Sequence, residues 1–279
     1  MTNQRPTALV TGTSRGIGQE IARALAGAGY DLALASRSGG EIETLAHELR
    51  KKGIEATAIP TDLTDPASVA ALAGAAEGAL GHVDVLVNNA GGDPQREFDQ
   101  LSWAENEAIF RLNVIGPVQL THLLLPGMLR AGKGHVVNIS SIAGRVGFPF
   151  TEAYAAAKDG MIGFTRVLRH DYRKRGVTAS AIVLGAIRDA GQGQRTSDEM
   201  GLTLPRSGTS PASAVAKAVL NAIRNDRAEI VVMPGPGRLL KAVMDLFPGF
   251  GPAVNAMAGA DATMQRVIEY RRRRSAHGA

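Results

Sequence analysis

The chain has 279 residues, of which 44% are hydrophobic and 20% charged, a balance that is typical of a globular domain and excludes an intrinsically disordered chain. Only 4% of the residues are aromatic, which argues against nucleic-acid binding by base stacking, and the absence of cysteine excludes disulfides and thiolate metal sites. Most of the net charge of +5 lies at the carboxyl terminus, where five arginines (Arg266 and Arg271 to Arg274) accompany a single glutamate, Glu269. The rest of the chain is almost neutral, so the basic charge is a property of this tail. Four clustered arginines alone would attract nucleic acid only nonspecifically, so we expect no nucleic-acid partner, and we also expect no metal site.

The amino-terminal segment is polar and leads directly into an apolar run, Thr7–Thr11, without the charged region and apolar core of a secretory signal. No uninterrupted apolar stretch reaches about 18 residues, so we expect no transmembrane helix. A cytoplasmic location is the expectation that follows.

Short runs rich in Val, Ile, Leu and Ala alternate along the chain with longer segments of helical periodicity. The predicted strands are Thr7–Thr11, Asp31–Ser36, Ile54–Ile59, Val83–Asn88, His135–Ser140, Val177–Leu184 and Glu229–Met233. The predicted helices are Gly16–Ala28, Glu41–Lys52, Pro66–Leu80, Ser102–Leu129, Glu152–Arg175 and Pro211–Arg224. Nearly continuous apolar strands that alternate with helices indicate an α/β fold, a doubly wound parallel sheet of the Rossmann type, over residues 1–233.

Two segments stand apart from this alternation. Residues 185–210 form a long polar loop after the sixth strand, and we expect them to act as a substrate lid. Residues 234–279 are predicted to form a helical extension packed on the same domain, with Leu239, Leu240, Val243, Met244 and Phe247 on one helical face and a further helix at Ala262–Arg274. We favour a cap over the pocket or a subunit contact for this extension. A peripheral membrane contact, through apolar faces beside clustered arginines, is the less favoured alternative.

A glycine-rich turn connects the first predicted strand to the first helix. Gly12 permits the tight turn, Gly16 allows backbone to approach a pyrophosphate, and Gly18 lets the helix pack closely on the sheet. The free N–H groups at the start of a helix attract an anion. The pattern predicts a dinucleotide site that also includes Ser14, Arg15 and Ile17.

The end of the second strand bears on the choice of cofactor. Proteins that bind NAD place an acidic residue there for the ribose 2′-hydroxyl, whereas this chain has Arg37, with Arg15 in the preceding turn. Guanidinium groups suit a 2′-phosphate. We therefore expect NADP(H) to be favoured over NAD(H).

Tyr154 and Lys158 lie four residues apart in a predicted helix, so that they share one face. An ammonium group beside a phenol lowers the phenol pKa, which makes Tyr154 a candidate general acid/base. Ser141 follows the fifth strand, Asn89 follows the fourth strand, and Asn113 lies in the long helix after it. Because the carboxyl ends of parallel strands meet at one edge of a sheet, we expect these side chains to converge.

In order and spacing these residues resemble the motifs of the short-chain dehydrogenase/reductase family, in particular its 3-oxoacyl-carrier-protein reductase-like members. The resemblance covers about residues 5 to 233 and rests on Thr11–Gly18, Asp62, Asn88–Gly91, Asn113, Ser141, Tyr154 and Lys158. It implies hydride transfer between NADP(H) and a small carbonyl or secondary alcohol. In that reaction Tyr154 exchanges a proton with the substrate oxygen, and Ser141 forms a hydrogen bond with the same oxygen.

The resemblance also implies roles at the cofactor. Lys158 would hold the nicotinamide ribose and lower the pKa of Tyr154, and Asn113 would hold a water molecule that links the lysine to a proton relay. The other implied cofactor contacts are Asp62, Leu63, Asn89, Ala90 and Gly91 on the adenosine side, and Gly185 and Ile187 on the nicotinamide side. A homodimer or homotetramer is implied as well.

The chain departs from the family pattern after the sixth strand. Leu184 precedes Gly185 where the family has a proline, and Asp189 stands where a threonine is expected. A carboxylate at this place would repel an anionic substrate at short range. The departure leaves a second hypothesis open, a sensor or scaffold that binds NADP(H) without turnover.

Overall fold

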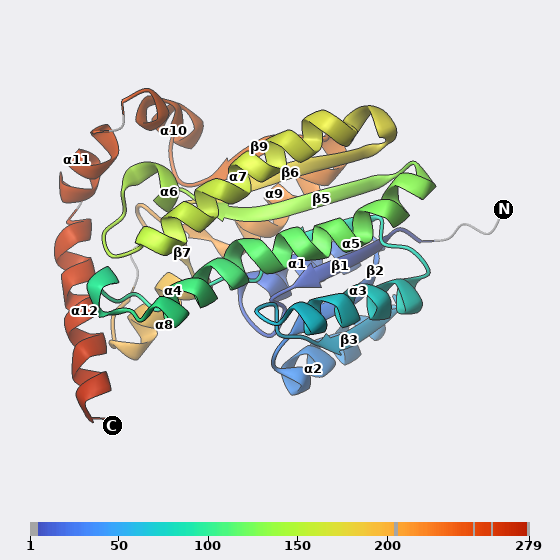
Figure 1. Cartoon of the computed structure of the whole chain (residues 1–279), viewed down its shortest axis with the longest axis horizontal. Helices are drawn as coiled ribbons and strands as arrows, with labels where there is room; N and C mark the ends of the chain where they lie inside the picture. Colours follow the sequence, from blue (N-terminus) through green and yellow to red (C-terminus); the bar gives the residue numbers. More distant parts are fainter. Residues whose placement is uncertain (1–4, 204–205, 248, 258, 278–279) are drawn as a thin grey trace.

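Seven parallel strands form the central sheet of the computed structural model, which describes residues 5–203, 206–247, 249–257 and 259–277 (Figure 1). The strands are β1 (Thr7–Thr11), β2 (Asp31–Ser36), β3 (Ala56–Pro60), β4 (Val85–Asn88), β5 (Gly134–Ser141), β6 (Val177–Leu184) and β9 (Glu229–Val232). Their order is β3-β2-β1-β4-β5-β6-β9, and each begins and ends within two residues of the predicted bounds. The predicted doubly wound α/β fold is thereby confirmed.

Helices cover both faces of the sheet (Figure 1). One face carries α1 (Ile17–Gly27), α2 (Gly39–Arg50) and α9 (Ala212–Asn225); the other carries α3 (Pro66–Leu80), α4 (Trp103–Phe110), α5 (Gly116–Ala131) and α7 (Glu152–Tyr172). Short elements are η1 (Phe98–Gln100), η2 (Arg111–Ile115), α6 (Ala143–Val146) and η3 (Arg173–Arg175). Side chains of β1 alternate between the two apolar clusters, with Ala8 and Val10 in one and Leu9 in the other, as the two-residue period of a strand requires.

Local sequence signals explain where several helices begin. Asp65 precedes α3 and its carboxylate accepts a hydrogen bond from the backbone N–H of Ala67, with Pro66 at the first helical position. Ser102 and Glu105 form a reciprocal capping box at the start of α4. These caps satisfy N–H groups that have no partner within the helix.

The long helix expected at Ser102–Leu129 is interrupted at its centre. Residues Arg111–Ile115 adopt a π-helical turn, η2, between α4 and α5. Asn113 lies in this turn, 1% exposed, and its Nδ2 donates to the carbonyl of Ile109. The wider turn directs the Asn113 amide inward, toward the segment that follows β4.

The run Trp103–Ala131 is long and apolar enough to cross a membrane by length and composition alone. In the structure, Leu120, Leu124 and Met128 of this run are buried in the apolar cluster beneath the sheet. The apolar side chains of this run therefore pack in the protein core, as in the core helix of a globular domain.

The expected lid loop contains regular structure. Strands β7 (Ile187–Arg188) and β8 (Ser210–Pro211) pair with each other, and helix α8 (Gly191–Glu199) lies between them. Residues 204–205 of this segment lie outside the described part. Because α8 is almost wholly polar, its sequence shows no apolar face that would predict a helix.

The carboxyl-terminal extension folds into α10 (Gly237–Leu246), α11 (Phe250–Met257) and α12 (Ala260–His277), and α12 runs past α8 at the carboxyl end of the sheet (Figure 1). The apolar residues that recur at helical spacing here are buried only in part. Met244 is buried, but Leu239 is 65% and Phe247 62% exposed, because the helix buries Lys241 instead. Lys241 is stabilised there by ion pairs with Glu229 and Asp245.

His135 on β5 is a buried titratable group within the core. Its Nε2 lies 2.7 Å from Ser180 Oγ on β6, and Ser180 donates its own proton to the carbonyl of Arg227. The imidazole must therefore donate through Nε2. Burial lowers the pKa of His135 to about 4, below the usual value of about 6.5.

We predict that His135 makes the protein less stable as the pH falls from about 6.5 toward 4, because the unfolded chain binds this proton more readily than the folded one. The expected loss is about 1–3 kcal/mol in the free energy of unfolding. Urea titrations at pH 7.5 and 4.5 measure it in the wild type and in His135→Gln, which keeps a side-chain N–H donor but does not titrate. The exposed His170→Gln serves as control. An equal pH difference in His135→Gln and in the wild type would contradict the prediction.

Candidate active site

A cleft of about 490 Å³ runs along the carboxyl edge of the sheet. Predicted site residues from the ends of β1 to β4 and from α7 meet in its lining: Gly12, Ser14, Arg15, Ile17, Gly18, Arg37, Asp62, Leu63, Asn89, Ala90, Gly91, Tyr154 and Lys158. The other predicted residues, Gly16, Asn113, Ser141, Gly185 and Ile187, are not among the lining residues. The structure therefore brings together segments that are up to about 150 residues apart in the sequence, as the parallel topology predicts.

The glycine-rich turn packs against the end of β4 with no space for side chains. A Cβ atom at Gly12 would lie 2.8 Å from the Cα of Ala90, and one at Gly18 would lie 2.1 Å from the carbonyl oxygen of Gly12. The Nδ2 of Asn89 donates to the carbonyls of Thr11 and Gly12 at 2.9 and 3.2 Å. Asn89 thus lines the cleft and also holds the turn in place, a role that its position in the sequence did not reveal.

Gly16 and Asp189, which do not line the cleft, make contacts that join the first turn, the segment around α8 and the start of α9. Gly16 has φ +60° and its backbone lies against Ala190 and Gly191, the residues at the start of α8. Asp189 also has a positive φ, and its Oδ1 accepts a hydrogen bond from the N–H of Ala212 at the start of α9. Because this carboxylate caps a helix and does not line the cleft, the expected repulsion of an anionic substrate by Asp189 finds no support in the structure.

Tyr154 and Lys158 occupy the first two turns of α7. The Nζ atom of Lys158 lies 5.6 Å from the centre of the Tyr154 ring and donates to the carbonyl of Ile139 at 3.1 Å. Ser141, at the end of β5, forms a hydrogen bond with Tyr154 and accepts one from the N–H of Ala143. The proton-bearing groups of the site are thus grouped on β5 and α7.

Burial controls the titration of this pair. It raises the pKa of Tyr154 to about 12, with a further rise from the Asp93 carboxylate and an opposing effect of the Ser141 hydrogen bond. It lowers the pKa of Lys158 to about 8. The expected lowering of the Tyr154 pKa by Lys158 is not found, because the ammonium group is itself desolvated and directed toward Ile139. A phenol that keeps its proton at neutral pH is suited to donate that proton to a substrate oxygen.

Asn113 acts on the cleft through the backbone behind it. Its Oδ1 accepts from the N–H of Gly92 at 3.2 Å, and its Nδ2 donates to the carbonyl of Gly92 at 2.8 Å. A Cβ atom at Gly91 would lie 2.7 Å from Asn113 Oδ1 and 2.9 Å from Lys158 Nζ. Gly91 is therefore the point at which the two polar side chains come together.

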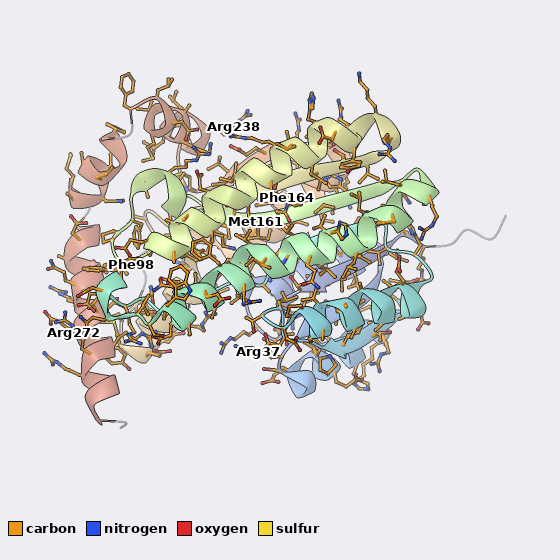
Figure 2. The ribbon with its side chains drawn as sticks, in the orientation of Figure 1. Arg37, Phe98, Met161, Phe164, Arg238 and Arg272 are labelled. Carbon is orange, nitrogen blue, oxygen red and sulfur yellow. The ribbon has the colours of Figure 1, made fainter. Side chains whose placement is uncertain are left out.

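The charged lining of the cleft is predominantly cationic. It contains Arg15, Arg37, Lys158 and Arg195 against Glu41 and Asp62, and Arg37 projects at the carboxyl edge of the sheet (Figure 2). Asp62 accepts hydrogen bonds from the N–H and Oγ1 of Thr64, which lower its pKa together with the nearby charge of Arg37. Such a lining suits a ligand with several negative charges.

The sequence did not single out some of the lining residues. These are Ala35, Ser36, Ser38, Glu41, Thr61, Thr64, Leu112, Ile139 and Ser140. Several of these residues are next in sequence to predicted site residues, and that proximity could have indicated them. The remaining lining residues lie at positions that the sequence did indicate: Gly92 at the expected edge of the pocket, Leu184 at the departure from the family pattern, and Gly191, Gln192 and Arg195 in the expected lid. Gln192 and Arg195 belong to α8, for which the sequence carried no helical signal. Among the described residues, no group of three or more His, Asp or Glu side chains is arranged to hold a metal ion.

Comparison with known proteins finds similarity to dehydrogenases and reductases, among them solved structures in complex with NADP or NAD. The family described as short chain dehydrogenase matches residues 6–200. The ketoacyl reductase HetN of Nostoc sp. is 36% identical over 230 residues, which cover 82% of this chain and 79% of the relative. Among solved structures, a metagenomic short-chain oxidoreductase in complex with NADP is 30% identical with a TM-score of 0.69, covering 82% of this chain and 97% of that one. A short-chain dehydrogenase/reductase from Burkholderia phymatum in complex with NAD is 29% identical with a TM-score of 0.72, covering 83% and 90%.

We predict that Gly91→Ala disrupts the site while the fold persists. The added methyl group must displace Asn113 or Lys158, so we expect the affinity for NADPH to fall about tenfold or more, measured by nucleotide fluorescence titration. Gly74→Ala is the matched control, since no atom lies within 4 Å of the added Cβ and alanine favours the interior of α3. Wild-type affinity in Gly91→Ala would show that Gly91 does not position these side chains.

Proposed function

The chain belongs to the short chain dehydrogenase family, and from that premise we propose that it is a reductase that transfers hydride between NADP(H) and a carbonyl or secondary alcohol. The observation that carries the proposal is the position of the Tyr154 phenol in the wall of a cationic cleft, beside Ser141 and on the same helix as Lys158. When bound, the nicotinamide supplies the hydride. The protein supplies the proton and the placement of both reactants.

Each of the grouped residues has a distinct task in this proposal. Tyr154 donates its proton to the carbonyl oxygen of the substrate, which becomes the hydroxyl of the product. Ser141 stabilises the negative charge that develops on the same oxygen. Lys158 holds the ribose of the cofactor, and Asn113 positions Lys158 through Gly91 and Gly92.

We favour NADP(H) on the basis of Arg15 and Arg37, both exposed at the end of the cleft that is formed by β1 and β2. A 2′-phosphate at this end would meet two guanidinium groups, with the carboxylates of Glu41 and Asp62 also in the lining. The two compared structures hold NADP and NAD, respectively, so the preference rests on the arginines of this chain.

The substrate class to test first is a ketoacyl compound, because the relative from Nostoc is named a ketoacyl reductase. We also propose a homo-oligomer. Trp103 on α4 is 75% exposed and Val167 on α7 is 60% exposed, and apolar side chains of this size are commonly covered at interfaces.

We predict that Tyr154→Phe loses turnover and keeps cofactor binding, because the change removes one oxygen atom and its proton. NADPH oxidation against aldehydes, ketones and acyl thioesters should fall by about 10²–10⁴-fold. NADPH affinity, measured by fluorescence titration, should stay close to that of the wild type. If the wild type binds NADPH and turns over no compound of a broad panel, the alternative of a sensor or scaffold is favoured.

We predict that Arg37→Ala weakens NADPH binding about tenfold or more and leaves NADH binding unchanged, since only the former carries the 2′-phosphate. Paired calorimetric titrations measure both constants. Arg238→Ala, on the distant helix α10 (Figure 2), controls for the loss of a surface charge. Equal weakening of both nucleotides would remove the role given to Arg37.

A further inference from the structure

The role proposed for the cleft leaves one cationic side chain without a task, Arg195 on α8. Gly191, Gln192 and Arg195 all line the cleft, so one face of this helix forms part of its wall. Arg195 follows Gly191 by one helical turn and is partly buried. It therefore faces the interior of the cleft from the lid, opposite the residues of the first turn.

The guanidinium group of Arg195 has no hydrogen bond or ion pair within the described ranges of the chain. The charges that act on it are mostly positive: Arg15 and Arg271 lower its pKa, as does burial, and Glu199 acts in the opposite direction. Glu199 already forms an ion pair with Arg271 at 2.7 Å. A partly buried cation among like charges is unfavourable, and a bound anion would reverse that balance.

Tertiary contacts hold α8 firmly in this position. Both polar atoms of the Gln192 side chain bond to the backbone of Asp93, at 3.0 and 2.6 Å, and Thr196 Oγ1 donates to Gln95 Oε1 at 2.6 Å. From the other side, Tyr270 of α12 donates to the carbonyl of Glu199. A fixed helix presents Arg195 with little loss of entropy when a ligand binds.

The position of α8 indicates which anion it meets. The backbone at the start of α8 lies against Gly16, immediately before α1, where the free N–H groups of the helix terminus attract a pyrophosphate. Arg15 belongs to the same turn and lies close enough to Arg195 for their charges to interact. Arg37, in contrast, lies beyond β2, where the 2′-phosphate is expected.

We propose that Arg195 binds the pyrophosphate of the dinucleotide from the lid side, opposite the N-terminus of α1. The cofactor then joins the lid to the glycine-rich turn, two parts of the chain that are about 180 residues apart. The proposal rests on the dinucleotide site proposed above and is independent of the proton chemistry at Tyr154. Since pyrophosphate is common to both cofactors, Arg195 contributes equally to NADPH and NADH.

The test compares dissociation constants for NADPH and NADH, by calorimetry on the full chain, in the wild type, Arg195→Gln and Arg195→Lys. We expect Arg195→Gln to weaken both nucleotides by the same factor of about 10 to 100, and Arg195→Lys, which keeps the charge, to weaken them less. The weakening should shrink as salt is raised, because screening reduces the contribution of the charge in the wild type. Arg238→Gln should bind both nucleotides like the wild type.

Three results would overturn the proposal. Unchanged dissociation constants for both nucleotides in Arg195→Gln would show that Arg195 does not bind the cofactor. If the KM for the carbonyl substrate rises while those dissociation constants stay unchanged, Arg195 binds the substrate instead. Selective loss of NADPH would assign it to the 2′-phosphate. Should Arg195→Gln fail to fold, as judged by its thermal midpoint, Arg195→Lys and the salt dependence decide. A wild type that binds neither nucleotide would refute the proposed function itself, which is a distinguishable outcome.

Discussion

The side-chain amide of Asn89 holds the turn after β1 against the end of β4, and the shape of the cleft depends on this contact. Nδ2 donates to the carbonyls of Thr11 and Gly12, while Thr11 Oγ1 accepts the N–H groups of Asn89 and Ala90. These hydrogen bonds occupy the carbonyl groups of Thr11 and Gly12 that face the end of β4. The N–H groups at the start of α1 are left for a ligand, and Gly12 and Gly18 keep the two segments in contact by having no side chain.

The two ends of the cleft use burial in opposite ways. At the end formed by β1 and β2, the side chains of Arg15 and Arg37 are exposed to solvent. At the α7 end, burial disfavours both charged forms, so that Tyr154 keeps its proton and Lys158 holds its own less firmly. In the proposed function, the exposed end of the cleft binds the anionic part of the cofactor and the buried end donates the proton.

The carboxyl-terminal extension packs against α8 on the side away from the cleft. Met264, Val267 and Ile268 of α12 are buried, Arg271 pairs with Glu199 of α8, and Arg272 pairs with Glu97 before η1. Figure 2 shows Arg272 on α12 beside Phe98 of η1. The arginines that dominate the net charge of the chain are thus used in part within the molecule; the side chain of Arg274 lies outside the described part. The extension contacts and stabilises α8, the helix that carries Arg195, although no residue of the extension lines the cleft within the described part of the chain.

The sequence by itself determined the sheet and the positions of the site. Strands buried on both faces require apolar runs, so β1, β2 and β6 begin and end at the predicted residues, and site residues follow from the ends of such strands. The tertiary structure alone decided the helical form of α8, the π-turn at Asn113, the outward apolar side of α10 and the high pKa of Tyr154. Each of these depends on contacts with another segment of the chain, such as Asp93 for Gln192, Gly92 for Asn113 and Glu229 for Lys241. A local sequence pattern shows which residues can be buried. Which side chains are in fact buried, which polar groups pair with each other and which pKa values shift depend on how separate segments pack together.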